Sequence, residues 1–294
     1  MRQQAQAKKK RRLPDWLKAP LPQGKDYARV KRLIEEYNLN TICTSGNCPN
    51  RGECWSAGTA SFMILGEKCT RNCRFCGVTN VLPDAVDWKE PRRLAETIQL
   101  LELKHAVITS VARDDLRDGG AAFWAKTIRT VKEYNPETTL EVLIPDLNGK
   151  QENLRKIIDA KPEVISHNME TVKRLTPRIR NLARYERSLK VIRMIAESGL
   201  IAKSGIMVGL GETKEEVLEL MDDLVDAGCD VLTIGQYLQP DSHLEQVHEY
   251  VPPEVYDMYY EEGMKRGLGH VESGPLVRSS YHAEKHVNVK KTES

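Results

Sequence analysis

The chain has 294 residues, of which 40% are hydrophobic and 29% charged, so it can form a folded core and is not disordered by composition. It contains no stretch of 18 consecutive apolar residues, so we expect no transmembrane helix. The net charge is +2, but residues 1–12 carry six basic and no acidic residues, which leaves 38 basic and 42 acidic residues in the remainder. This mildly acidic remainder excludes a protein that coats nucleic acid.

The basic segment 1–12 resembles a solvated tail, with electrostatic attraction of an acidic partner or a targeting role as alternatives. An amphipathic helix is expected over residues 26–37. From residue 62 onward, apolar or β-branched runs alternate with helix-patterned segments. The expected strands are 62–65, 106–111, 140–144, 164–166, 204–208 and 231–234, and the expected helices are 90–103, 121–134, 151–160, 185–198 and 214–227.

This alternation predicts parallel strands joined by right-handed crossovers. Six strands are too few for a closed eightfold barrel, so we predict an α/β fold built as a partial (β/α)6 TIM-type barrel. A doubly wound open sheet is the main alternative. The barrel is expected over residues 61–240, between an N-terminal extension, 13–60, and a C-terminal extension, 241–294. In either fold the chemistry belongs at the C-terminal ends of the strands.

Six of the seven cysteines lie in the 34 residues from 43 to 76, which indicates metal binding rather than a disulfide scaffold. A structural zinc ion normally takes four ligands, but these cysteines form two groups of three and no histidine lies between residues 43 and 104. Three thiolates suit a [4Fe–4S] cluster with one iron left for another ligand. The alternative is a zinc-stabilised binding module. The two triplets are Cys43-x4-Cys48-x5-Cys54 and Cys69-x3-Cys73-x2-Cys76.

The second triplet, Cys-Thr-Arg-Asn-Cys-Arg-Phe-Cys at 69–76, follows the first expected strand and resembles the C-x3-C-x-aromatic-C signature of the radical S-adenosylmethionine (SAM) superfamily. The resemblance implies that Cys69, Cys73 and Cys76 hold a [4Fe–4S] cluster, with Phe75 at the aromatic position. It implies that the open iron binds S-adenosyl-L-methionine through its amino and carboxylate groups. Reductive cleavage would then give a 5′-deoxyadenosyl radical that removes hydrogen from unactivated C–H bonds.

Further motifs between residues 14 and 281 resemble the lipoyl synthase family. The resemblance implies sulfur insertion at C6 and C8 of an octanoyl chain on a lysine of a lipoyl-carrier protein domain, with two SAM molecules consumed. An external electron donor and an iron–sulfur cluster carrier are implied as partners. A radical enzyme that attaches sulfur to another substrate is the alternative. The motifs are Pro-Asp-Trp-Leu at 14–17, the cysteine motif at 43–55, Thr-Ser-Val-Ala-Arg-Asp-Asp-Leu-Arg-Asp-Gly-Gly at 109–120 and Arg-Ser-Ser-Tyr (R-S-S-Y) at 278–281.

The same resemblance implies that Cys43, Cys48 and Cys54 hold a second, auxiliary [4Fe–4S] cluster, which is the sulfur source. The family pattern places a further ligand at Ser280, with Ser279 as the alternative. A serine oxygen is harder than a thiolate and should hold iron less tightly, which suits a cluster that is dismantled. Candidate SAM contacts at or just beyond strand ends are Thr109, Ser110, Asn168, Glu170 and Gly209.

Other polar residues allow structural interpretations. Glu141 and Asp146 could recognise the cofactor, or could be a barrel contact and a helix cap. His282 and His286 have i, i+4 spacing, but we expect no metal there, because the iron–sulfur ligands are already accounted for. Cys229 is expected to pack as a small apolar side chain. The expected compartment is the cytoplasm or an organellar matrix, with no nucleic-acid or membrane partner.

Overall fold

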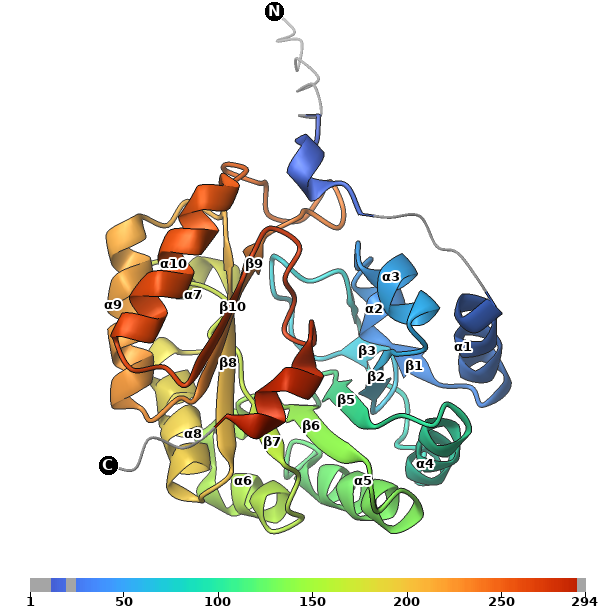
Figure 1. Cartoon of the computed structure of the whole chain (residues 1–294). Helices are drawn as coiled ribbons and strands as arrows, with labels where there is room; N and C mark the ends of the chain where they lie inside the picture. The colour runs from blue at the N-terminus through green and yellow to red at the C-terminus, as the bar shows by residue number, and fades with distance from the viewer. Residues whose placement is uncertain (1–11, 20–24, 290–294) are drawn as a thin grey trace, which may run out of the picture.

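The structure is a computed structural model that describes residues 12–19 and 25–289. Its centre is an eight-stranded sheet in the order β1-β2-β5-β6-β7-β8-β9-β10, and only β1 runs antiparallel to its neighbour. The strands curve into an open barrel with the helices on its outer side (Figure 1). The first and last strands of the order do not pair, so the predicted partial barrel is confirmed.

Six parallel strands match the expected ones within a few residues, and the helices between them match as well. The strands are β2 (Ser61–Ile64), β5 (His105–Ser110), β6 (Thr139–Leu143), β7 (Val164–Ser166), β8 (Ile201–Val208) and β9 (Val231–Gln236). The helices are α4 (Glu90–Leu100), α5 (Ala121–Tyr134), α6 (Gln151–Ile158), α8 (Tyr185–Glu197) and α9 (Lys214–Asp226). Short apolar strands buried on both faces are typical of a parallel sheet covered by helices.

Four described strands, β1, β3, β4 and β10, were not anticipated, and β10 is the one that adds a parallel strand to the central sheet. Helix α10 (Pro253–Lys265) leads into β10 (His270–Ser273), which pairs in parallel with β9 and so continues the barrel into the expected C-terminal extension. Its four residues, His-Val-Glu-Ser, contain one apolar side chain, so they lack the hydrophobic run that identified the other strands. The domain boundary at 240/241 remains a prediction.

The N-terminal extension packs beside the β2 edge of the sheet (Figure 1). Helix α1 (Lys25–Glu36) confirms the helix expected over 26–37. The prediction for the basic tail falls almost entirely on residues 1–11, which lie outside the described part of the chain. The other elements here are η1 (Asp15–Leu17), β1 (Asn40–Thr41), α2 (Ile42–Ser45) and α3 (Arg51–Ser56), followed after β2 by the small parallel sheet of β3 (Lys68–Cys69) and β4 (Thr79–Asn80).

The C-terminal segment returns to the barrel interior and ends in η3 (Ala283–Asn288). Its His286 is buried, and Nδ1 lies 2.9 Å from Nζ of Lys203 on β8. That ammonium also donates to both carboxylate oxygens of Glu141 on β6, at 2.7 and 2.8 Å, and Glu141 and Lys203 are fully buried. Glu141 is therefore a barrel contact. Asp146 caps the short η2 (Leu147–Gly149) by accepting the Asn148 N–H at 3.1 Å.

Two further features complete the fold. Cys229 is buried in the hydrophobic core, where its thiol contacts the Val231 carbonyl at 3.3 Å, as its expected packing role requires. The remaining element is the short helix α7 (Thr176–Ile179). Within residues 12–19 and 25–289, we find no helix with the length and hydropathy needed to span a bilayer.

Candidate active site

A cavity of about 350 Å³ lies at the C-terminal ends of the barrel strands. Its wall combines segments from the N-terminal extension, the loop after β2, the strand ends and the C-terminal segment, which are far apart in sequence. Among the sequence-predicted residues, Cys54 and Gly209 do not line it. Those that do are Cys43, Cys48, Cys69, Cys73, Phe75, Cys76, Thr109, Ser110, Asn168, Glu170 and Ser280.

The second cysteine triplet lies on the loop from β3 to β4. Cys69 ends β3, and its carbonyl accepts a hydrogen bond from Asn80 Nδ2 at 3.0 Å. Cys73 and Cys76 are joined by a turn in which the Cys76 N–H donates to the Cys73 carbonyl at 3.1 Å. Burial raises the pKa of the Cys73 thiol to about 11 and that of Cys76 to about 12. These thiols would lose their protons on binding iron, because metal ligation requires the thiolate.

The first triplet is built on two short helices. Cys43 lies in α2 and Cys54 in α3, and the Cys48 N–H between them donates to the Cys43 carbonyl at 3.1 Å. Burial, which is the larger effect, and the nearby Cys43 and Cys48 thiols together raise the pKa of the Cys54 thiol to about 12. The described cysteines form no disulfide. Three close, free thiols are a donor set that fits iron–sulfur ligation.

The R-S-S-Y segment lies against this first triplet. Ser280 and Ser279 share the cavity wall with Cys43 and Cys48. The Tyr281 hydroxyl donates to Glu53 Oε1 on α3 at 3.2 Å, and Asn50 Nδ2, next to α3, donates to the Leu276 carbonyl at 2.7 Å. The fold therefore brings the candidate oxygen ligand at residue 280 into the same cavity lining as cysteines more than 200 positions away.

Unsatisfied polar groups in the cavity fit a polar cofactor. Ser110 Oγ and Asn168 Oδ1 are buried and have no hydrogen-bond partner among the described residues. Burial raises the pKa of the nearby Glu170 carboxyl, and the Asn168 side chain lowers it in part. The Thr109 hydroxyl is already engaged, since it donates to the Leu143 carbonyl at 3.1 Å. Ser110, Asn168 and Glu170 thus offer the hydrogen-bonding capacity that amino, carboxylate and hydroxyl groups of SAM require.

Gly209 is required by local packing. Its φ is +93°, and a Cβ there would lie 2.6 Å from the Glu249 carbonyl and 2.1 Å from Gln236 Nε2. Its N–H donates to the Glu212 carboxylate. The cofactor-binding role expected for Gly209 remains a prediction.

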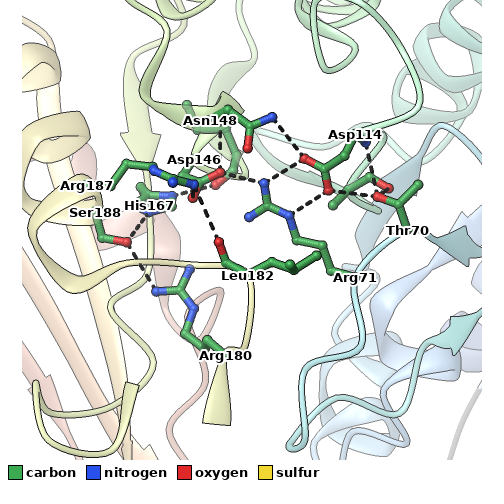
Figure 2. Close-up of polar contacts among 12 residues, drawn as sticks. Thr70, Arg71, Asp114, Asp146, Asn148, His167, Arg180, Leu182, Arg187 and Ser188 are labelled. Atoms are coloured by element: carbon green, nitrogen blue, oxygen red, sulfur yellow. Dashed lines mark hydrogen bonds and ion pairs between the residues drawn. The ribbon is translucent and has the colours of Figure 1, made fainter. Parts of the chain in front are cut away.

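Two arginines in the cavity wall, Arg71 and Arg180, were not expected from the sequence, and their polar contacts are drawn in Figure 2. Arg71 lies between Cys69 and Cys73, and its guanidinium pairs with Asp114 and Asp146. Arg180 donates to the Met169 carbonyl at 3.1 Å, and its positive charge lowers the pKa of Cys73 against the effect of burial. Arg71 could have been noticed inside the cysteine motif, whereas no sequence pattern marks Arg180.

A cluster of His270, Glu272 and His286 brings three ligand atoms within 4.8 Å of one another. Lys203 lies 2.9 Å from Nδ1 of His286 and donates to it, which leaves the proton of the neutral ring on Nε2. A metal ion would need the lone pair of that Nε2, and it would be repelled by the ammonium. Among the described residues this Nε2 has no hydrogen-bond partner, and the hydrogen bond inside the cluster joins His270 Nε2 to Glu272 Oε2 at 3.4 Å. The nearby ammonium therefore argues against a metal ion here.

Known proteins and family models match most of the chain. A family model described as the radical SAM superfamily matches residues 63–224, and one described as the N-terminal domain of lipoyl synthase matches residues 1–48. The chain is 58% identical over 276 residues to a lipoyl synthase of Parabacteroides distasonis, covering 94% of this chain and 98% of that one. It is 55% identical over 276 residues to a mitochondrial lipoyl synthase of Nematostella vectensis, covering 94% and 95%.

Solved structures share the fold at low sequence identity. The chain superposes on Streptococcus suis SuiB bound to its precursor peptide SuiA with a TM-score of 0.58 and 12% identity, over 84% of this chain and 52% of that one. Methylornithine synthase gives a TM-score of 0.51 and 13% identity, over 74% and 60%. At this identity the likeness concerns only the fold.

Proposed function

The chain belongs to the lipoyl synthase family of the radical SAM superfamily, and from this premise we propose how its site performs lipoyl synthesis. The reaction inserts two sulfur atoms, at C6 and C8, into an octanoyl chain carried on a lysine of a lipoyl-carrier domain. Each insertion replaces one unactivated C–H bond, and an auxiliary cluster supplies the sulfur. SAM bound at a [4Fe–4S] cluster supplies the radical chemistry that such bonds require.

One observation carries the proposal: cysteines of both triplets line the same cavity. A carbon of the octanoyl chain must first lose hydrogen and then receive sulfur, so the radical source and the sulfur source must both reach it. Two structural zinc sites would have no reason to share a cavity in which Ser110 Oγ and Asn168 Oδ1 have no hydrogen-bond partner among the described residues. The shared cavity therefore supports sulfur insertion over a binding module.

We assign the binding and orientation of SAM to Ser110, Asn168 and Glu170. Its surroundings are shaped by Thr109 and Phe75. Ser280 gives the auxiliary site a fourth ligand through its oxygen. The protein would thus hold two clusters per chain, with Cys69, Cys73 and Cys76 at the radical cluster and Cys43, Cys48 and Cys54 at the auxiliary cluster.

The partners follow from the same chemistry. The substrate is an octanoylated carrier domain, an external donor delivers the electrons, and an iron–sulfur cluster carrier rebuilds the auxiliary site after turnover. We propose the cytoplasm as the compartment, with an organellar matrix as the alternative, because free cysteines need a reducing environment.

Anaerobic reconstitution and a peptide assay test the function. Two [4Fe–4S] clusters should give about eight irons per chain with matching sulfide. Incubation with an octanoyl-lysine peptide, reductant and SAM should give a product in which two sulfurs replace two hydrogens. Stoichiometric zinc without iron would support the binding module instead. Iron with deoxyadenosine formation but no sulfur on the peptide would point to another radical enzyme.

The ligand assignment is tested by Ser280→Ala, with Ser279→Ala as its matched control. Ser280→Ala should still form 5′-deoxyadenosine but lose lipoyl product, because only the auxiliary site loses a ligand. Ser279→Ala removes the hydrogen bond from Asn168 Nδ2, which is 2.7 Å long, and should retain product. Normal lipoyl formation by Ser280→Ala would refute the assignment, and loss of product only in Ser279→Ala would transfer it to the neighbour.

A further inference from the structure

The loop that carries the second triplet is fastened by a buried arginine. The Arg71 side chain is 7% exposed, and its Nε and Nη2 donate to the two oxygens of Asp114, each at 2.8 Å. Nη2 also donates to Asp146 Oδ1 at 2.6 Å. Asp114 follows β5 and Asp146 follows β6, so one guanidinium joins the loop to the ends of two neighbouring strands (Figure 2). Such a planar fork gives directional as well as charge complementarity.

Both carboxylates are held by further contacts. Asp146 pairs with Arg187 from α8 at 3.2 Å and accepts the Asn148 N–H at 3.1 Å. Asp114 accepts hydrogen bonds from the Thr70 hydroxyl at 2.9 Å and from Asn148 Nδ2 at 3.2 Å. Hydrogen bonds and the Arg71 charge outweigh burial at Asp146 and hold its pKa at about 2. The network is therefore charged and fixed at physiological pH.

The Arg71 ion pairs fix the part of the loop that donates hydrogen bonds to the Cys69 sulfur. The Arg71 N–H donates to Cys69 Sγ at 3.4 Å, and the Ala112 N–H donates to the same sulfur at 3.3 Å. Thr70 links the two donor segments, since its N–H donates to the Ala112 carbonyl at 3.1 Å and its hydroxyl proton is shared between that carbonyl, at 3.0 Å, and Asp114. Hydrogen bonds to cluster-bound sulfur make reduction easier, because they withdraw charge from the thiolate.

We propose that Arg71, clamped between Asp114 and Asp146, is a positioning residue that holds two N–H donors on Cys69 Sγ and so sets the reduction potential of the radical cluster. The clamp acts through the loop that carries Cys69. This inference rests on the proposed function, because it assumes that Cys69 is a cluster ligand. It concerns the ease of electron entry, which precedes SAM cleavage.

The test compares full-length Arg71→Lys and Arg71→Gln with wild type. Lysine keeps the positive charge but cannot form the pair of parallel hydrogen bonds to Asp114, whereas glutamine removes both the charge and this pair of hydrogen bonds. In the reconstituted enzyme, spectroelectrochemistry should show a more negative radical-cluster potential in both variants, larger for glutamine. In the cluster-free chain, amide hydrogen exchange of residues 69–76 should rise at least about tenfold, because the loop is released. Deoxyadenosine formation by Arg71→Gln should fall by a similar factor.

Arg266→Gln is the matched control, because Arg266 also pairs with two carboxylates, Glu262 and Asp222, on helices outside the cavity. It should leave potential and loop exchange unchanged. Unchanged potential and exchange in both Arg71 variants would overturn the inference, as would full restoration by lysine. A lowered melting temperature without a change in potential would reduce Arg71 to a structural residue. Failure of wild type to bind iron would refute the proposed function itself.

Discussion

Gly235, on β9, makes room for the segment that carries R-S-S-Y. A Cβ at this position would lie 2.0 Å from the Val277 carbonyl oxygen and 3.2 Å from Arg278 Nη1. The φ of Gly235 lies outside the left-handed region, so alanine would bring no backbone strain of its own. Substitution with alanine therefore tests one contact, that between the strand and the C-terminal segment.

The size of the effect follows from that distance. Real Cβ contacts essentially never fall below 3.0 Å, so the Val277 carbonyl must retreat by about 1 Å. Overpacking of this kind costs about 1–3 kcal/mol of stability. A displacement of ~1 Å in a positioned group can cost on the order of 100-fold in rate. We expect Gly235→Ala to lose lipoyl product by about that factor while deoxyadenosine formation changes less than about threefold.

The assay measures both products in the same reaction with the octanoyl peptide. Gly199→Ala is the control, because its φ of +86° makes alanine strained although no heavy atom lies within 4 Å of the added methyl. It should lower stability by about 1 kcal/mol and leave the product ratio unchanged. Normal lipoyl formation by Gly235→Ala would refute the placement of the C-terminal segment, and equal loss of both products would show that the damage is general.

Two further predictions concern buried charge. Glu90 accepts the Leu65 N–H at 2.9 Å, and burial raises its pKa from 4.5 to about 7. The folded state then binds this proton more tightly than the unfolded chain, so the contribution of Glu90 to stability falls by up to ~3 kcal/mol as pH rises from about 4.5 to 7. In urea unfolding, Glu90→Gln should therefore be more stable than wild type at pH 8. An unchanged dependence of stability on pH would contradict this prediction. Lys203→Met should lower stability by about 3–5 kcal/mol because Glu141 remains buried without its partner, and adding Glu141→Leu should recover most of the loss in a thermal melt; a double variant no better than the single would contradict it.

The barrel could be predicted because its strands carry strong local patterns. Runs such as Ala106–Ile108 in β5 are fully apolar, and five of the six expected strands are followed by an expected helix of ordinary length. Strand β10 escaped prediction because it depends on pairing with β9 and on cover from α10. Tertiary contacts of this kind produce no periodic hydrophobic pattern within a four-residue strand.

The candidate site was predictable where spacing itself encodes the chemistry, as in the two cysteine triplets. The support around them was not. Arg71 reaches Asp146 across 75 positions, and Asn168 reaches Ser279 across 111 positions. Such contacts depend on which strand ends the barrel brings together, and a single sequence does not specify that at the level of side chains.

The R-S-S-Y segment illustrates how the fold gives meaning to a weak local pattern. By its sequence alone it resembles a solvated turn, yet it contacts residues on two sides of the structure. Ser279 bonds Asn168 on the SAM side, Tyr281 bonds Glu53 on the auxiliary side, and the positive charge of Arg278 lies near Cys48. Ser280, which lies between these anchors, lines the cavity together with Cys43 and Cys48. A solvated turn would need none of these contacts, so they support the proposed ligand role of Ser280.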